Sequence, residues 1–175
     1  YLANGHAQIL SEGDKYGYDY YAQVRNLGMW VNGRFSMGNF SANAGLRAGY
    51  ESFWREGLLR KGLFPGQDYT DNGETIPAAR DHNGDIITSY GKSDVEGFLT
   101  WAGKLGLNYV MGGNQRVYAN IGYFNDAPKF NMAFLSPRTR NSMIDDLQTI
   151  KTFSSDVNYQ FTGNGYNARI TAYYT

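Results

Sequence analysis

The most suggestive pattern for metal chemistry is the run DHNGD, in which oxygen-bearing side chains stand at alternate positions. Asp81, Asn83 and Asp85 match the first three ligand positions of an EF-hand calcium loop, where this spacing lets oxygens wrap one hard cation. The match then ends, because Ile86 stands where the loop needs glycine and Lys92 where it needs glutamate. A turn in which an Asp side chain accepts backbone hydrogen bonds explains the run better. We therefore expect neither a metal nor a cofactor.

Catalytic pairings are also missing from the sequence. The chain has no cysteine, and its two histidines, His6 and His82, have no partners at the spacing of a triad or a zinc site. Asp145 and Asp146 are adjacent, but neighbours in sequence need not converge, and an exposed loop or helix end accounts for them equally well. We expect that the chain is not an enzyme.

Ligand binding has a better candidate in the run PRTR and the aromatic residues before it. Arg138 and Arg140 could donate forked hydrogen bonds, and Phe130 and Phe134 could stack on an anionic or sugar ligand. These four residues form the candidate ligand-binding site. The alternative is a packed, hydrogen-bonded loop.

The elements that would position these residues alternate with period two, which is the strand period. In the stretch 99–109, for example, Leu99, Trp101, Leu105 and Tyr109 share one face while Lys104 lies on the other. At about 3.3 Å per residue and a tilt of about 45°, this stretch would span roughly 25 Å, the height of the apolar band of a membrane barrel. Six strands are predicted, with a possible seventh in 1–10: 16–31, 40–54, 99–109, 116–123, 153–161 and 166–174.

The predicted connections between strands are of two kinds. Short turns are expected at Asn32-Gly33, in MGGN (111–114) and in TGNG (162–165), whereas 57–94 and 125–148 are long and rich in turn residues. Short turns at one rim and long loops at the other are typical of a membrane β-barrel. The charged residues expected to face its lumen are Arg47, Glu51, Lys104, Arg116, Asp156 and Arg169.

Composition agrees with a barrel and argues against other classes. The 175 residues include 15 Tyr and 10 Phe, and amphipathic aromatic rings suit membrane interfaces. The formal net charge is zero and there is no basic stripe, so no nucleic-acid partner is expected. A mean hydropathy of -0.52 and the lack of a long apolar run exclude a helical span, but barrel strands hide their apolar face in alternate residues.

A family resemblance is carried by three stretches. NDAPKFNMAFLSPRTRN (125–141), followed by LQTIKTFSSDVNY (147–159) and NARITAYYT (167–175), resembles the barrel of TonB-dependent outer-membrane transporters, particularly of the starch-utilisation type. ESFWREG (51–57) resembles another piece of the same barrel. The resemblance implies that residues 1–175 are part of one antiparallel transmembrane β-barrel domain. Six or seven strands cannot close a barrel, since bacterial barrels need about eight or more, so the rest of a plugged barrel of about 22 strands is implied outside the sequence.

The same resemblance implies a function in the bacterial outer membrane, with the long loops facing the cell exterior. The chain would belong to a receptor that imports a nutrient (sugar, peptide or chelate) with energy from the TonB–ExbB–ExbD complex, which would contact parts outside this segment. Further implied partners are outer-membrane lipid, a surface lipoprotein, and a small-molecule or oligomeric nutrient.

Two other functions stay open. One is a passive or structural outer-membrane barrel, such as an adhesin or scaffold with ligand-binding surface loops. The other is a soluble carbohydrate-binding β-sandwich, in which the apolar faces of two sheets would have to meet in one core.

Overall fold

The computed structural model describes residues 2–3, 6–7, 10–60 and 64–175, and the chain is all-β. Strands make up 63% of it and helix 2%, so every large surface belongs to sheet or loop. This confirms the predicted all-β class. The main sheet is antiparallel, has up to seven strands and does not close on itself.

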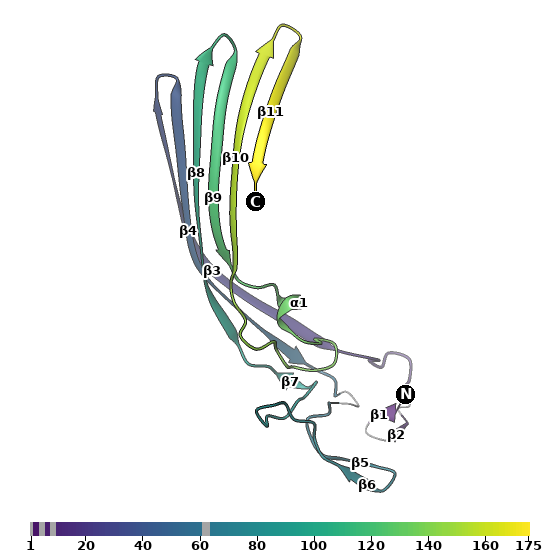
Figure 1. Ribbon diagram of the computed structural model, residues 1–175. Helices are drawn as coiled ribbons and strands as arrows, with labels where there is room; N and C mark the ends of the chain where they lie inside the picture. Colours follow the sequence, from purple (N-terminus) through teal and green to yellow (C-terminus); the bar gives the residue numbers. More distant parts are fainter. Residues whose placement is uncertain (1, 4–5, 8–9, 61–63) are drawn as a thin grey trace. The chain divides into compact units, whose positions relative to one another are not determined.

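Six long strands and one short strand form this sheet, in the order β11-β10-β9-β8-β4-β3, with β7 paired to β4 (Figure 1). All six long strands lie where alternation predicted them; β11 has the predicted ends, and the other five differ somewhat at theirs. Their bounds, with that of the short strand, are β3 (Tyr20–Met37), β4 (Phe40–Gly57), β7 (Gly91–Lys92), β8 (Glu96–Gly112), β9 (Gln115–Asp126), β10 (Ile150–Gly163) and β11 (Tyr166–Tyr174).

The remaining elements are small. β5 (Tyr69–Asp71) and β6 (Glu74–Ile76) form a separate hairpin, and α1 (Phe130–Ala133) is a single helical turn. β1 (Leu2–Ala3) pairs with β2 (His6–Ala7) where one possible strand was predicted. Residues 1, 4, 5, 8 and 9 of that prediction lie outside the described residues.

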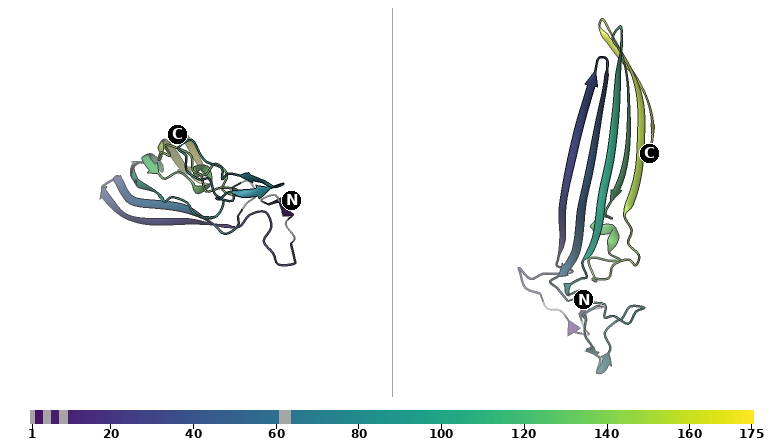
Figure 2. Two further views of the ribbon diagram at one scale, coloured as in Figure 1. Left: turned by 90° about the horizontal axis from the view of Figure 1, so that it is seen from below. Right: turned by 90° about the vertical axis from the view of Figure 1, so that its left-hand side faces the viewer.

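The turns between neighbouring strands correct one prediction and confirm two. Asn32 and Gly33 lie inside β3, and the chain turns instead at Gly38, whose φ of 55° suits glycine. The predicted turns in 111–114 and 162–165 are present, with positive φ at Asn114 and Gly165. All three hairpins turn at the same end of their strands (Figures 1 and 2).

Contacts within the chain divide it into two compact units. Unit 1 contains the long connections and comprises Tyr1–Arg25, Ser52–Gly97 and Pro128–Leu147. Unit 2 contains the three hairpins and comprises Asn26–Glu51, Phe98–Ala127 and Gln148–Thr175. β3, β4 and β8 contribute residues to both.

One face of the sheet in unit 2 is apolar and exposed. In the strand register Leu105 pairs with Ile121, and two residues further along Ala119 pairs with both Leu107 and Val157. Apolar side chains therefore continue across neighbouring strands. Leu105 is 42% exposed. Its neighbours on this face include other exposed apolar residues: Leu99, Leu107, Tyr109, Ile121, Tyr123, Phe153, Val157, Tyr159 and Ile170.

The opposite face of unit 2 is polar and cross-linked by side-chain hydrogen bonds. Asn120 donates to the Asp156 carboxylate at 3.0 Å, and Thr171 donates to the Asn158 side chain at 2.6 Å. Arg169 donates to the Tyr118 hydroxyl at 3.2 Å. Amides, hydroxyls and charges therefore form a ladder over three adjacent strands, β9, β10 and β11.

The six charged residues predicted to face a lumen lie in this polar setting. Lys104, Arg116, Asp156 and Arg169 share the polar face by register. Arg47 pairs with the Asp126 carboxylate, and Glu51 accepts a hydrogen bond from Asn26 at 2.8 Å. That this face lines a lumen stays a prediction.

Candidate functional site

The aromatic half of the predicted ligand-binding site forms a small core in unit 1. Phe130 and Phe134 lie 4.6 Å apart between ring centroids, and both pack near Phe53 of β4, at 6.2 and 6.4 Å. Phe53 is fully buried and Phe134 is 4% exposed. Phe134 could meet a ligand only if this cluster opened, so its ring contributes first to the packing of the loop.

The two arginines of the predicted site also have aromatic neighbours within unit 1. The Arg138 guanidinium lies 5.2 Å from the centre of the Tyr18 ring, and that of Arg140 lies 5.4 Å from the centre of Phe64. Arg138 is exposed, whereas the Nε atom of Arg140 is buried and has no hydrogen-bond partner among the described residues. Of the four predicted residues, Arg138 is thus the most accessible to a ligand. The prediction that the four bind one together stays a prediction.

Arg55 is a central residue of unit 1 that the sequence did not single out. It is 1% exposed, and its guanidinium donates to the carbonyl of Pro137 at 2.6 Å, to the carbonyl of Ser89 at 2.9 Å and to the side chain of Asn141. The ring of Tyr20 lies 4.8 Å away. One buried cation therefore joins β4 to both long connections.

Asn141 completes this junction from the other side. Its backbone N–H donates to the Thr88 carbonyl at 2.7 Å, and its side chain donates to the carbonyls of Tyr90 and Gly91 at 3.3 and 3.0 Å. The Arg55 backbone exchanges further bonds with Ser93 at 2.8 and 2.9 Å. The two long connections are therefore pinned to each other and to the end of β4.

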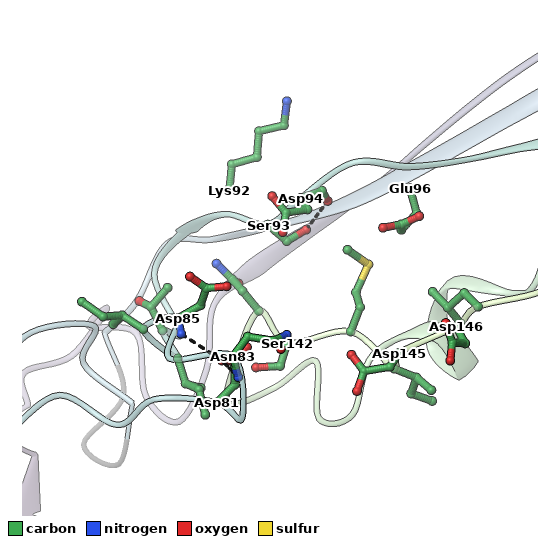
Figure 3. A pocket seen from close by; sticks show the side chains of 17 residues that line it. Asp81, Asn83, Asp85, Lys92, Ser93, Asp94, Glu96, Ser142, Asp145 and Asp146 are labelled. Carbon is green, nitrogen blue, oxygen red and sulfur yellow. Dashed lines mark hydrogen bonds between the residues drawn. The ribbon is translucent and has the colours of Figure 1, made fainter.

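The pinned connections enclose a pocket of about 850 Å³ (Figure 3). Residues 81–96 of the first connection form one side, and 141–147 of the second form the other. At the rim, His82 lies 3.9 Å from the Asp145 carboxylate. The charged side chains that line the pocket are Asp81, Asp85, Lys92, Asp94, Glu96, Asp145 and Asp146.

Charge sets what this pocket can accept. Six carboxylates face a single cation, and Figure 3 shows Lys92 extending away from them. An excess of negative charge attracts cations and disfavours anions, while carboxylates also accept hydrogen bonds from hydroxyl groups. The lining therefore suits a cationic or hydroxyl-rich molecule better than an anionic one.

The calcium-like run forms a turn inside this lining. The Asp81 carboxylate accepts hydrogen bonds from the backbone N–H groups of Asn83 and Asp85, both at 2.9 Å. This is the Asx-turn geometry expected from the sequence. Among the described residues, no group of three or more His, Asp or Glu side chains has the arrangement to hold a metal ion.

Sequence reasoning missed the pocket and its Arg55 anchor for a physical reason. Alternation along β4 identifies Arg55 as one charged residue among several, and only the folded loops supply its acceptors from 34 to 86 residues away. A signal was present in the sequence, because Arg55 lies in ESFWREG and Asn141 ends SPRTRN, two runs singled out above.

Comparisons with known proteins give no identification: no family model, no curated protein and no solved structure matches the chain. No helical segment in the part of the chain that the structure describes has the length and apolarity to cross a membrane.

Proposed function

We propose that the chain forms part of the wall of an outer-membrane β-barrel that imports a nutrient with energy delivered through TonB. The observation that carries the proposal is the two-faced sheet of unit 2, with exposed apolar side chains on one face and a hydrogen-bonded polar ladder on the other. Barrel walls in membranes have this alternation, with lipid on one side and water on the other.

Exposure of the apolar face of unit 2 to water is unfavourable, so we expect another apolar surface to cover it. Removing a side chain such as Leu or Ile from water is worth about 1.5–3 kcal/mol, and Leu99 and Ile170 are 74% and 73% exposed. Large contiguous apolar patches on proteins mark contact with a partner or a membrane. Lipid acyl chains would cover all of the exposed apolar side chains on this face without a second layer of protein.

A groove on this face has the chemistry for an acyl chain. It holds about 400 Å³, and small residues, Ala48 and Gly103, lie between the larger Met29, Leu46 and Trp101. Its lining is almost entirely apolar apart from Arg47, which turns to Asp126 on the polar face. The groove supports lipid as the covering.

Energised import rests on the family resemblance, and the stretches that carry it are in contact with one another. Arg55 belongs to ESFWREG, and its acceptors Pro137 and Asn141 belong to the SPRTRN run. The stretches that carry the resemblance therefore meet in unit 1. We expect the connections 58–95 and 127–149 to face the cell exterior, where they would contact the nutrient and a surface lipoprotein, while TonB would act through parts of the protein outside this chain.

The test uses uptake of a labelled maltooligosaccharide by cells that express the protein, with and without TonB. Energised import predicts that uptake is lost in the TonB deletion although the protein remains in the outer membrane. Uptake that survives the deletion would favour the passive or structural barrel, with the strands still in the membrane. A protein found only in soluble fractions would contradict both.

A separate substitution tests whether the predicted ligand-binding residues contact the nutrient. Arg138→Gln changes the exposed arginine and leaves the buried ring of Phe134 in place, so the barrel should still insert and resist heat in detergent. If Arg138 contacts the nutrient, uptake should fall several-fold, whereas Arg34→Gln, an exposed arginine of unit 2, should leave it unchanged. Equal uptake by both variants would remove Arg138 from the site.

A further inference from the structure

Two cations lie against one tryptophan near the long-connection end of β4. The Arg25 guanidinium is 4.6 Å from the centre of the Trp54 ring, and the Lys92 Nζ atom is 4.8 Å from it. Arg25 comes from β3 and Lys92 from β7, the strands that pair with β4 at this end, so the cations approach Trp54 from neighbouring strands. Arg25 and Lys92 are exposed, whereas Trp54 is 8% exposed beneath them.

Trp54 belongs to the side of β4 that the second long connection leaves open. Successive side chains on a strand point to opposite faces, and its neighbours Phe53 and Arg55 contact Phe130 and Pro137 of that connection. Trp54 therefore points the other way.

The positive charge of this cluster is not neutralised by an ion pair in the described part of the chain. The described ion pairs involve neither Arg25 nor Lys92. Glu56 stands opposite Lys92 in the β4–β7 ladder, yet the ammonium group lies over the Trp54 ring instead. Arg25 and Lys92 are therefore accessible cations that can bind an external anion next to the Trp54 ring.

We propose that Arg25, Lys92 and Trp54 form a binding site for the phosphate group of a membrane lipid. The proposal rests on the proposed function, since it places this face of β4 at the exterior membrane interface. An arginine fork and a lysine ammonium both bind phosphate oxygens, and the buried ring of Trp54 holds both cations against it. The lipid phosphate would contact the cations while its acyl chains contact apolar side chains.

The test measures binding of phosphatidic acid to the purified protein in mixed micelles, with phosphatidylcholine as the reference lipid. The double variant Arg25→Gln/Lys92→Gln removes both cations and keeps Trp54. Each basic residue near an anionic surface is worth about 1 kcal/mol, or about fivefold in affinity, so the double variant should bind phosphatidic acid about thirtyfold more weakly. The swap Arg25→Lys/Lys92→Arg preserves charge and should retain most of the binding.

The matched control is Arg80→Gln/Lys129→Gln, which removes two exposed cations from the long connections of unit 1. Its affinity for phosphatidic acid should equal that of the unmodified protein. An equal loss in the control, or less than about a threefold loss in the site variant, would overturn the proposal. Displacement of the lipid by millimolar inorganic phosphate would also overturn it, in favour of a site for free phosphate.

This experiment separates the lipid site from the transport function. Binding is measured on purified protein without TonB, so passive uptake would leave a positive lipid result standing. Conversely, energised uptake with no selectivity for phosphatidic acid would remove the lipid site and leave the transport proposal intact.

Discussion

The two units of this chain use large apolar side chains in opposite ways. In unit 1, Phe53 is fully buried and packs near Phe130 and Phe134 from a long connection. In unit 2, Leu105 and Ile170 extend from strands of the same sheet and stay exposed. The first unit has its own covering layer, and the second presents its apolar face to whatever surrounds it.

This difference shows that alternation alone does not define a core. Strands of both units carry aromatic and aliphatic residues at every second position, but only unit 1 has a folded loop to pack against them. The polar side of unit 2 is the more connected face, because side chains of β9, β10 and β11 bond to one another there. Unit 1 is packed from within, whereas in the proposed barrel unit 2 would be stabilised by lipid.

The largest expected effect is on the internal core of unit 1. Phe53→Ala should lower the free energy of unfolding by about 3–5 kcal/mol, because it leaves a cavity under Phe130 and Phe134. Denaturant unfolding in detergent measures the loss. Phe153→Ala is the control, since Phe153 is 39% exposed in unit 2 and lipid can fill the space. Equal losses from the two substitutions would contradict the distinction between the units.

The next effect tests the surroundings of unit 2. Leu105→Arg should cost about 2–4 kcal/mol in lipid, the cost of an arginine on the lipid face near the midplane. Lys104→Gln, one residue away on the polar face, should change stability little. Unfolding in lipid vesicles measures both. If the two variants are equally stable, the apolar face does not contact lipid.

A smaller loss of stability is expected when Arg55, the buried cation that joins the two long connections, is replaced. Arg55→Met removes the donor of the hydrogen bonds to the Pro137 carbonyl, the Ser89 carbonyl and the Asn141 side chain, which should cost about 1–3 kcal/mol. Hydrogen exchange should rise in 58–95 and 128–147 before it rises in the hairpins of unit 2. Arg80→Met is the matched control, because in the described part of the chain the Arg80 guanidinium donates to a carbonyl of its own loop, that of Gly84. Unchanged exchange in both connections would show that Arg55 does not hold them together.

The smallest effect belongs to the polar face. Asp156→Ala removes the acceptor for Asn120 and Asn158, and water can replace it on an open face, so we expect a loss of about 0.5–1.5 kcal/mol. Unfolding in lipid vesicles measures this loss, as it does for Leu105→Arg. A loss larger than that of Leu105→Arg would reverse the assignment of the two faces.

The strands were predictable because their signal is local. Alternation in 99–109 and 153–161 lies within β8 and β10, and the turn residues Asn114 and Gly165 marked the ends of those strands. The Asn32-Gly33 prediction failed because tertiary pairing overrode local turn preference. Gly45 on the adjacent strand lacks a side chain at the point where Asn32 lies, so β3 continues past the dipeptide to Met37.

The site was less predictable because its contacts are long-range. Sequence placed Phe130 and Phe134 in a ligand-binding loop, but their burial depends on Phe53, which is far away in the chain. The carboxylates around the pocket come from two connections, and nothing in either one predicts the other. The long-range bonds of Arg55 and Asn141 help to bring them together.

The three hairpin turns also set the order in which the sheet is expected to assemble. β3–β4, β8–β9 and β10–β11 pair across turns of two residues, and such local pairings close in microseconds. The pairings of β4 with β8 and of β9 with β10 must wait for the closure of 58–95 and 127–149, which costs more chain entropy. We expect the three hairpins to form independently and the β4–β8 and β9–β10 pairings to form afterwards. The slow steps of folding would then be the closure of the same two connections that enclose the pocket.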